Sequence, residues 1–118
     1  MPLEIKKYLY DIAHAAELIT QFTAGKDFAD YQKDPILRMA VERAFAIIGE
    51  ALSRLAKLDA GLATRIAEHT RIIAFRNILV HAYAEVDDRL VWDVIATKLP
   101  GLRRQAAELL SEMEDREI

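Results

Sequence analysis

The apolar residues of this chain recur at spacings of three and four over long stretches, and this periodicity constrains the fold more than any other feature. Between residues 3 and 23, one stripe is formed by Ile5, Leu9, Ile12, Ala16 and Ile19. Such spacing places side chains on one face of an α-helix. Only four glycines and three prolines interrupt the 118 residues, and no strand-like alternation persists. The pattern predicts an all-α protein.

The residues between the stripes predict where helices begin and end. Gly25 suits the end of the first helix, Asp34-Pro35 the start of the second, and Thr70 a cap for the third. Pro100-Gly101 predicts a break before the last helix. Short connections favour antiparallel neighbours, so we expect an up-and-down bundle of four to five helices. The expected segments are helices over 3–23, 35–58, 71–83, 88–99 and 102–112, a connector over 27–34 and a helical turn over 62–68.

Two of these helices carry apolar faces that we expect to be buried. In the second helix the face comprises Ile36, Leu37, Ala40, Ala44, Ile47, Ile48, Ala51, Leu52 and Leu55. In the helix over 88–99 it comprises Leu90, Val91, Val94 and Ile95.

Composition indicates one globular domain over 1–118, with 113–118 as a frayed acidic tail. Hydrophobic residues make up 53% and charged residues 30% of the chain. The chain contains no cysteine, which excludes disulfides and thiolate zinc sites and suits a reducing cytoplasm. No stretch approaches the roughly 18 apolar residues of a membrane span. We expect a cytoplasmic protein that does not enter the membrane.

The charge distribution permits local binding of RNA or phosphate. The net charge of −3 argues against a protein that coats nucleic acid along its whole surface. Residues 35–84 nevertheless carry a net charge of +3, whereas the segments on either side are acidic. Most of these cations are also compatible with an ordinary solvated helix surface.

The basic middle segment contains four chemically useful side chains within eight residues: Arg76, Asn77, His81 and Tyr83. On a helical wheel with Arg76 at zero, Asn77 lies about 100° and His81 about 140° ahead, and Tyr83 about 20° behind. All four therefore share less than half of the circumference. Arginine binds phosphate through a planar fork of donors, and histidine transfers protons near neutral pH. Each residue alone also suits a structural role, such as a surface ion pair or a helix cap.

Two β-branched residues, Ile73 and Val80, fall inside this polar arc, at about 60° and 40° on the wheel. A face that mixes apolar and polar groups suits an interface or the floor of a cleft. We therefore expect a symmetric dimer in which two copies of this helix line one groove. The alternative is that Ile73 and Val80 complete a wide core stripe with the polar residues at its rim.

Other chemistry has little support in the sequence. No group of histidines and carboxylates has convincing metal-ligand spacing, and neither a glycine-rich phosphate loop nor a serine nucleophile elbow is present. We expect no metal and no cofactor.

The segment from Arg76 to Tyr83 resembles the R-x4-H-x-Y motif of the HepT ribonuclease toxins, within the HEPN superfamily. The resemblance covers nearly the whole chain and includes Asp11-Ile12, 47–51, 72–77, Val91-Trp92 and Leu99-Pro100. The chain departs from a common family pattern at Ala74, where many members have glycine. It also has Glu68-His69 where many have a Pro-Trp pair.

The resemblance implies a HEPN-like homodimer and an endoribonuclease toxin that cuts RNA, either tRNA or mRNA, without a metal. It implies that Arg76 and His81 are catalytic, that Asn77 supports them and that Tyr83 accepts AMP. The implied partner is a minimal nucleotidyltransferase antitoxin, which binds the toxin and AMPylates it. The alternative is a non-catalytic HEPN-like subunit that binds a nucleotide or a partner in a nucleotidyltransferase complex.

Overall fold

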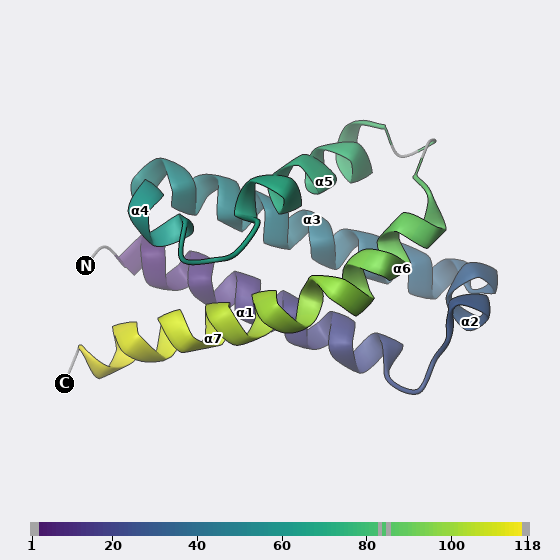
Figure 1. Ribbon diagram of the computed structural model, residues 1–118, viewed down its shortest axis with the longest axis horizontal. Coiled ribbons are helices and arrows are strands. Elements are labelled where there is room, and N and C mark those ends of the chain that lie inside the picture. The colour runs from purple at the N-terminus through teal and green to yellow at the C-terminus, as the bar shows by residue number, and fades with distance from the viewer. Residues whose placement is uncertain (1–2, 83, 85, 117–118) are drawn as a thin grey trace.

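The computed structural model describes residues 3–82, 84 and 86–116, and these residues form seven helices and no strand (Figure 1). The all-α bundle expected from the sequence is confirmed. Five helices have ten residues or more; of the two short ones, α2 forms where a connector was expected, and α4 lies at 60–63 where a helical turn over 62–68 was expected. The helices are α1 (Leu3–Thr23), α2 (Phe28–Lys33), α3 (Pro35–Leu58), α4 (Ala60–Ala63), α5 (His69–His81), α6 (Asp88–Thr97) and α7 (Leu99–Asp115).

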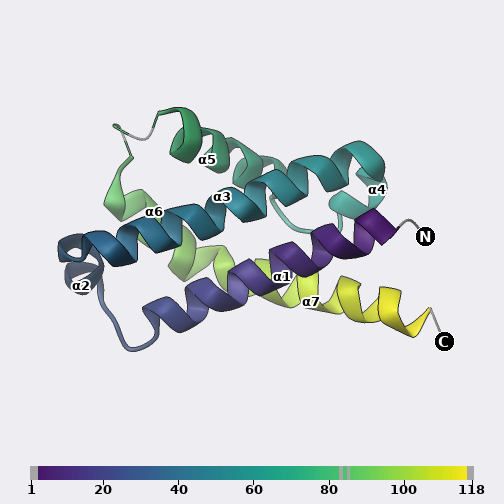
Figure 2. The same cartoon turned by 180° about the vertical axis from the view of Figure 1, so that it is seen from behind.

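The long helices pack in an up-and-down arrangement around α1 and α3. Helix α3 lies between α1 and α5, and α7 packs along α1, so both ends of the chain lie at the same end of the bundle (Figures 1 and 2). The core between α1 and α3 contains fully buried Leu9, Ile12, Ile48 and Leu52. Burial of these apolar side chains is the main source of stability for such a bundle.

The first half of the chain matches the expected boundaries closely. Helix α1 ends before Gly25, which adopts a positive φ of 74°, and Asp34 caps α3 by accepting a hydrogen bond from the Leu37 amide. The expected connector is instead the helix α2. Its capping residue Asp27 exchanges hydrogen bonds with Asp30, so that each carboxylate accepts from the other residue's amide.

The second half differs at three helix ends. Helix α5 begins at His69, two residues before the expected start, and its capping residue is Glu68, in a left-handed conformation with φ 59°. Thr70, the expected cap, lies inside the helix. Helix α7 includes Pro100 in its first turn, where proline costs no hydrogen bond. It continues to Asp115 with Met113 buried, beyond the expected end at residue 112.

The expected apolar faces are only partly buried. Ile36 is 80% exposed and Ile47 37% exposed, while Val41 and Phe45, which lay outside the expected stripe, are in the core. On α6 only Val91 is fully buried, and Leu90 is 42% exposed. The expected stripe includes residues that are exposed and omits two that are buried, because spacing shows which residues share a face but not which part of that face another helix covers.

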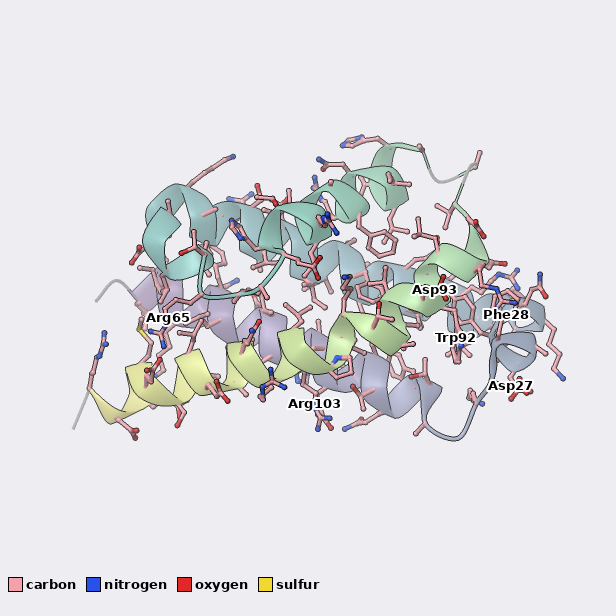
Figure 3. All side chains as sticks on the ribbon, viewed as in Figure 1. Asp27, Phe28, Arg65, Trp92, Asp93 and Arg103 are labelled. Carbon is pink, nitrogen blue, oxygen red and sulfur yellow. The ribbon has the colours of Figure 1, made fainter. Side chains whose placement is uncertain are left out.

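Ion pairs fasten the C-terminal helix at its edges. Arg103 of α7 contacts Glu17 of α1 at 2.5 Å. Nη2 of Arg65 donates to both carboxylate oxygens of Glu112 of α7. Figure 3 labels the two arginines. Among the helices of the described residues, none combines the length and the apolar character that crossing a membrane requires.

Candidate functional site

Arg76 lies at the closest approach of α5 to α3. Opposite it on α3 is Gly49, where an added Cβ would stand 2.1 Å from the Cβ of Arg76 and 2.5 Å from its Cγ. Real Cβ atoms do not approach so closely, so only glycine at position 49 lets the stem of Arg76 rest on the α3 backbone. The two helices thereby hold the start of the Arg76 side chain in place.

The guanidinium of Arg76 is held by two side chains. Nη2 donates to Oε2 of Glu50 at 2.7 Å, and Nη1 donates to Oδ1 of Asn77 at 2.9 Å. The side chain is 23% exposed, and its Nε is buried with no hydrogen-bond partner among the described residues. Arg76 is therefore fixed at its stem and at both terminal nitrogens, with one edge at the surface.

Glu50 joins two arginines. Its Oε1 accepts from Nε of Arg54 at 2.8 Å while its Oε2 accepts from Arg76. The hydrogen bond from Arg54, with the added charge of Arg76, lowers the pKa of Glu50 below its usual value. The carboxylate thus stays ionised and holds two guanidiniums side by side.

These residues lie in a groove between α1, α3 and α5, which we call the α1–α3–α5 groove. It consists of two adjoining hollows of about 300 and 390 Å³ that share Tyr8, Glu50, Arg54 and Arg76. Figure 2 shows the order of the three helices, with α3 in the middle. The groove carries five cations and three carboxylates on a chain that is acidic overall: Lys7, Arg43, Arg54, Lys57 and Arg76 against Glu4, Asp11 and Glu50.

His81 is the last residue of α5, and its side chain is exposed. Within the described part of the chain it has no hydrogen bond or ion pair, and Asn77 bonds Arg76 rather than His81. The structure therefore brings Arg76 and Asn77 together and leaves His81 free for another molecule. The expected AMP acceptor, Tyr83, lies outside the described residues.

The two apolar residues of the polar arc have different surroundings. Ile73 is partly buried and packs against the core, as the core-stripe alternative expected. Val80 is 41% exposed and lines the groove, as does Ile47 of α3. The groove thus reaches the last turn of α5, at the residue before His81.

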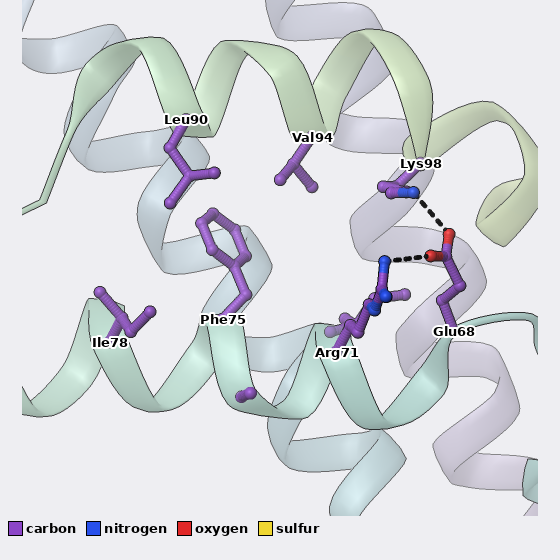
Figure 4. Close-up of a pocket in the computed structure, with 9 residues that line it drawn as sticks. Glu68, Arg71, Phe75, Ile78, Leu90, Val94 and Lys98 are labelled. Carbon is purple, nitrogen blue, oxygen red and sulfur yellow. Dashed lines mark hydrogen bonds and ion pairs between the residues drawn. The ribbon is translucent and has the colours of Figure 1, made fainter.

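A separate, third hollow, of about 290 Å³, lies on the other side of α5, against α6. Its wall is apolar, and Phe75, Ile78, Leu90 and Val94 point into it (Figure 4). At one end Glu68 bridges Arg71 at 3.1 Å and Lys98 at 2.6 Å. Arg76 lines the α1–α3–α5 groove and does not line this hollow.

Sequence reasoning assigned no role to Gly49 and Glu50. A Glu50–Arg54 pair one helical turn apart could have been predicted from spacing, but the contact with Arg76 spans 26 residues of chain. Among the described residues, no three or more histidines and carboxylates gather closely enough to hold a metal ion.

Several proteins that are named as ribonucleases are similar in sequence to this chain. A "Probable ribonuclease HepT" of Thermococcus cleftensis is 36% identical over 104 residues, covering 88% of this chain and 94% of that protein. A "Putative RNase" of Caldanaerobacter subterraneus is 32% identical, covering 91% of this chain and 95% of the relative. A "Putative RNase" of Methanocaldococcus jannaschii is 31% identical, covering 86% and 93%. No solved structure matches the chain.

The family comparison covers most of the fold. The sequence profile described as "Ribonuclease HepT-like" matches residues 12–109, which run from the middle of α1 to the second half of α7 and include Gly49, Glu50, Arg76 and His81. The chain belongs to the HepT-like ribonuclease family.

Proposed function

We propose that this protein is an endoribonuclease that cleaves RNA with Arg76 and His81 and needs no metal. The observation that carries the proposal is how Arg76 is held at the edge of a groove rich in cations. Its stem rests on Gly49, and its guanidinium is bound by Glu50. Membership of the HepT-like family and the ribonuclease names of the relatives support RNA as the substrate.

Each residue of the site has a chemical role in this proposal. Arg76 neutralises the charge that builds on the scissile phosphate, and its fixed position means that little reorganisation accompanies the reaction. His81 acts as general base on the ribose 2′-OH or as general acid on the leaving oxygen. Asn77 supports Arg76 through the hydrogen bond at 2.9 Å. The products are a 2′,3′-cyclic phosphate and a 5′-OH.

The protein acts as a homodimer in this proposal. One protomer supplies one histidine at the motif, so a second acid or base is most simply the His81 of another copy. Val80 and Ile47 are exposed apolar residues of the groove, and Ile36 and Met39, at 80% and 72% exposure, lie further along α3. Exposed apolar surface of this kind is typical of an interface.

We further propose that the protein is the toxin of a toxin–antitoxin pair. Its antitoxin is a minimal nucleotidyltransferase that binds it and transfers AMP to Tyr83. The added phosphate would bring negative charge two residues from His81 and compete with RNA for the cations of the site. The proposal rests on the sequence of the motif and on membership of the family.

The decisive experiment compares the wild type with Arg76→Ala and His81→Ala. We expect the wild type to cleave RNA in the presence of EDTA and to arrest growth when expressed alone. The loss of either side chain should lower cleavage by a factor of about 100 or more. Gel analysis of labelled RNA, with mapping of the product ends, measures this.

His69→Ala is the matched control, because His69 begins the same helix and lies outside both hollows of the groove. Full cleavage by His81→Ala, or a strict need for a divalent metal, would contradict the proposed chemistry. If neither substitution lowers RNA cleavage but both abolish nucleotide or partner binding, the protein is a binding subunit instead. Co-expression with the antitoxin should add the mass of one AMP to the wild type and none to Tyr83→Phe.

A further inference from the structure

The α1–α3–α5 groove continues well beyond Arg76, and none of the roles assigned so far uses its other cations. On α3 the groove is lined by Arg43, Ile47, Glu50, Arg54 and Lys57, at spacings of three and four. These residues share one face of the helix, over a length of roughly 21 Å. A groove of this length exceeds what a single scissile phosphate requires.

Two of these cations form no hydrogen bond or ion pair among the described residues. Arg43 and Lys57 are exposed, and neither forms a hydrogen bond or ion pair with another described residue. They lie on opposite sides of Glu50 along α3, one in each hollow. Lys7 and Arg54, by contrast, are already paired with Asp11 and Glu50. The groove therefore presents an unpaired cation on each side of Arg76.

An aromatic ring lies where the two hollows meet. Tyr8 of α1 lines both hollows and is partly exposed, with the Lys7 ammonium 5.4 Å from the centre of its ring. Grooves that bind single-stranded nucleic acid combine cations that follow the backbone with aromatic rings on which bases stack.

We propose that the α1–α3–α5 groove is the track of a single RNA strand. Arg43 and Lys57 bind backbone phosphates on either side of the phosphate held by Arg76, and Tyr8 offers a stacking surface to a base between them. This inference rests on the proposed ribonuclease function and extends it, because it assigns the substrate contacts outside the reacting centre. Arg54 keeps its place beside Glu50 and contributes charge to the middle of the track.

The test measures RNA binding apart from cleavage. In a His81→Ala background, the affinity of a short fluorescein-labelled oligouridine is followed by anisotropy between about 50 and 200 mM salt. Arg43→Gln combined with Lys57→Gln should weaken binding on the order of tenfold. The slope of log affinity against log salt should become shallower by about 1.4, since each phosphate contact on a single strand contributes about 0.7.

The matched control is Lys33→Gln combined with Arg104→Gln. It removes the same charge from two exposed side chains outside the groove, and its affinity and salt slope should equal those of the parent. Equal effects of the two double variants would overturn the track, because net charge alone would then explain the loss.

The outcomes separate the track from the function on which it rests. If the groove variant binds RNA like its parent and the wild type still cleaves, the track is wrong and the ribonuclease stands. If the groove variant changes only the oligomeric state, Arg43 and Lys57 lie in the contact between protomers, and the track is wrong. If neither the parent binds nor the wild type cleaves RNA, the proposed function itself fails.

Discussion

At the scale of single residues, the hydrogen bonds of Arg76 set the geometry of the candidate site. Arg76 and Asn77 were expected to act near each other, and they are joined by a hydrogen bond at 2.9 Å. The main partner of Arg76 is Glu50, on another helix, and no local pattern indicates a pair so far apart in the chain. His81 and Asn77 are one turn apart, yet no hydrogen bond joins them; Asn77 Oδ1 accepts from Arg76.

Tyr31 allows a prediction at this scale. Its ring is fully buried beside Trp92, with ring centres 5.4 Å apart, and its hydroxyl has no hydrogen-bond partner among the described residues. Burial, assisted by Glu42 and Asp88, raises the pKa of Tyr31 well above its usual value. Tyr31→Phe removes an unpaired polar group and should raise the free energy of unfolding by about 1 kcal/mol at neutral pH.

The same substitution should change the alkaline limb of the stability profile. The folded state keeps Tyr31 neutral at a pH where the unfolded chain ionises it. The free energy of unfolding is therefore unaffected by this difference in pKa below the unfolded-state pKa of about 10, and it falls as the pH rises above that value. The decline above pH 10 should therefore be shallower in Tyr31→Phe, by up to about 1.4 kcal/mol per pH unit. Urea unfolding followed by circular dichroism measures both effects. Tyr10→Phe, at a ring 53% exposed, should show neither, and a destabilised Tyr31→Phe would reveal a hydrogen bond at that hydroxyl.

At the scale of helices, ends with local signals were predictable and ends with tertiary causes were not. Asp34-Pro35 started α3 as expected, because a cap and a first-turn proline act within one turn. The Asp27 and Asp30 capping pair of α2 also lies in the sequence, but the segment is only six residues long. Helix α5 begins at His69, directly after Glu68, whose carboxylate pairs with Arg71 and with Lys98, thirty residues away.

Gly49→Ala tests how α3 positions α5. Alanine favours helix by about 1 kcal/mol, but its Cβ would overlap that of Arg76, and overpacking of this kind costs about 1–3 kcal/mol. We expect a lower melting temperature and a loss of cleavage, because α5 must move away and Arg76 then leaves Glu50. Gly101→Ala is the matched control, since nothing lies within 4 Å of its added Cβ. Melting curves and cleavage assays of both variants measure these effects. If Gly49→Ala keeps the melting temperature and the cleavage of the wild type, the packing of α5 on α3 adapts to the added methyl group without cost.

At the scale of the whole molecule, the bundle is thin. It measures 46 × 29 × 20 Å, and the shortest extent is about two helix diameters. Every long helix therefore has a face at the surface, including the face of α3 that carries the groove. Ile36, Ile47 and Leu90, which were expected to be buried, therefore lie on faces that no second layer of the described residues covers completely.

The proposed dimer can be tested at Val80. Val80 and Leu90 are 41% and 42% exposed, but Val80 lines the α1–α3–α5 groove and Leu90 the hollow between α5 and α6. We expect the wild type to sediment as a dimer of a 13.4 kDa chain, Val80→Asp as a monomer and Leu90→Asp as a dimer. Dissociation by Leu90→Asp alone would place the interface on the α6 side, and a monomeric wild type would exclude the dimer.

The sequence by itself determined the helical class, the extents of α1 and α3, and the common arc of Arg76, Asn77 and His81. These follow from interactions within a few turns of one helix, which residue spacing encodes directly. Only the tertiary structure decided that Gly49 admits the stem of Arg76, that Glu50 holds its guanidinium and that cations from α1 and α3 line one groove with it. Those contacts join helices far apart in the chain, and they depend on how closely the helices approach, which no periodicity records.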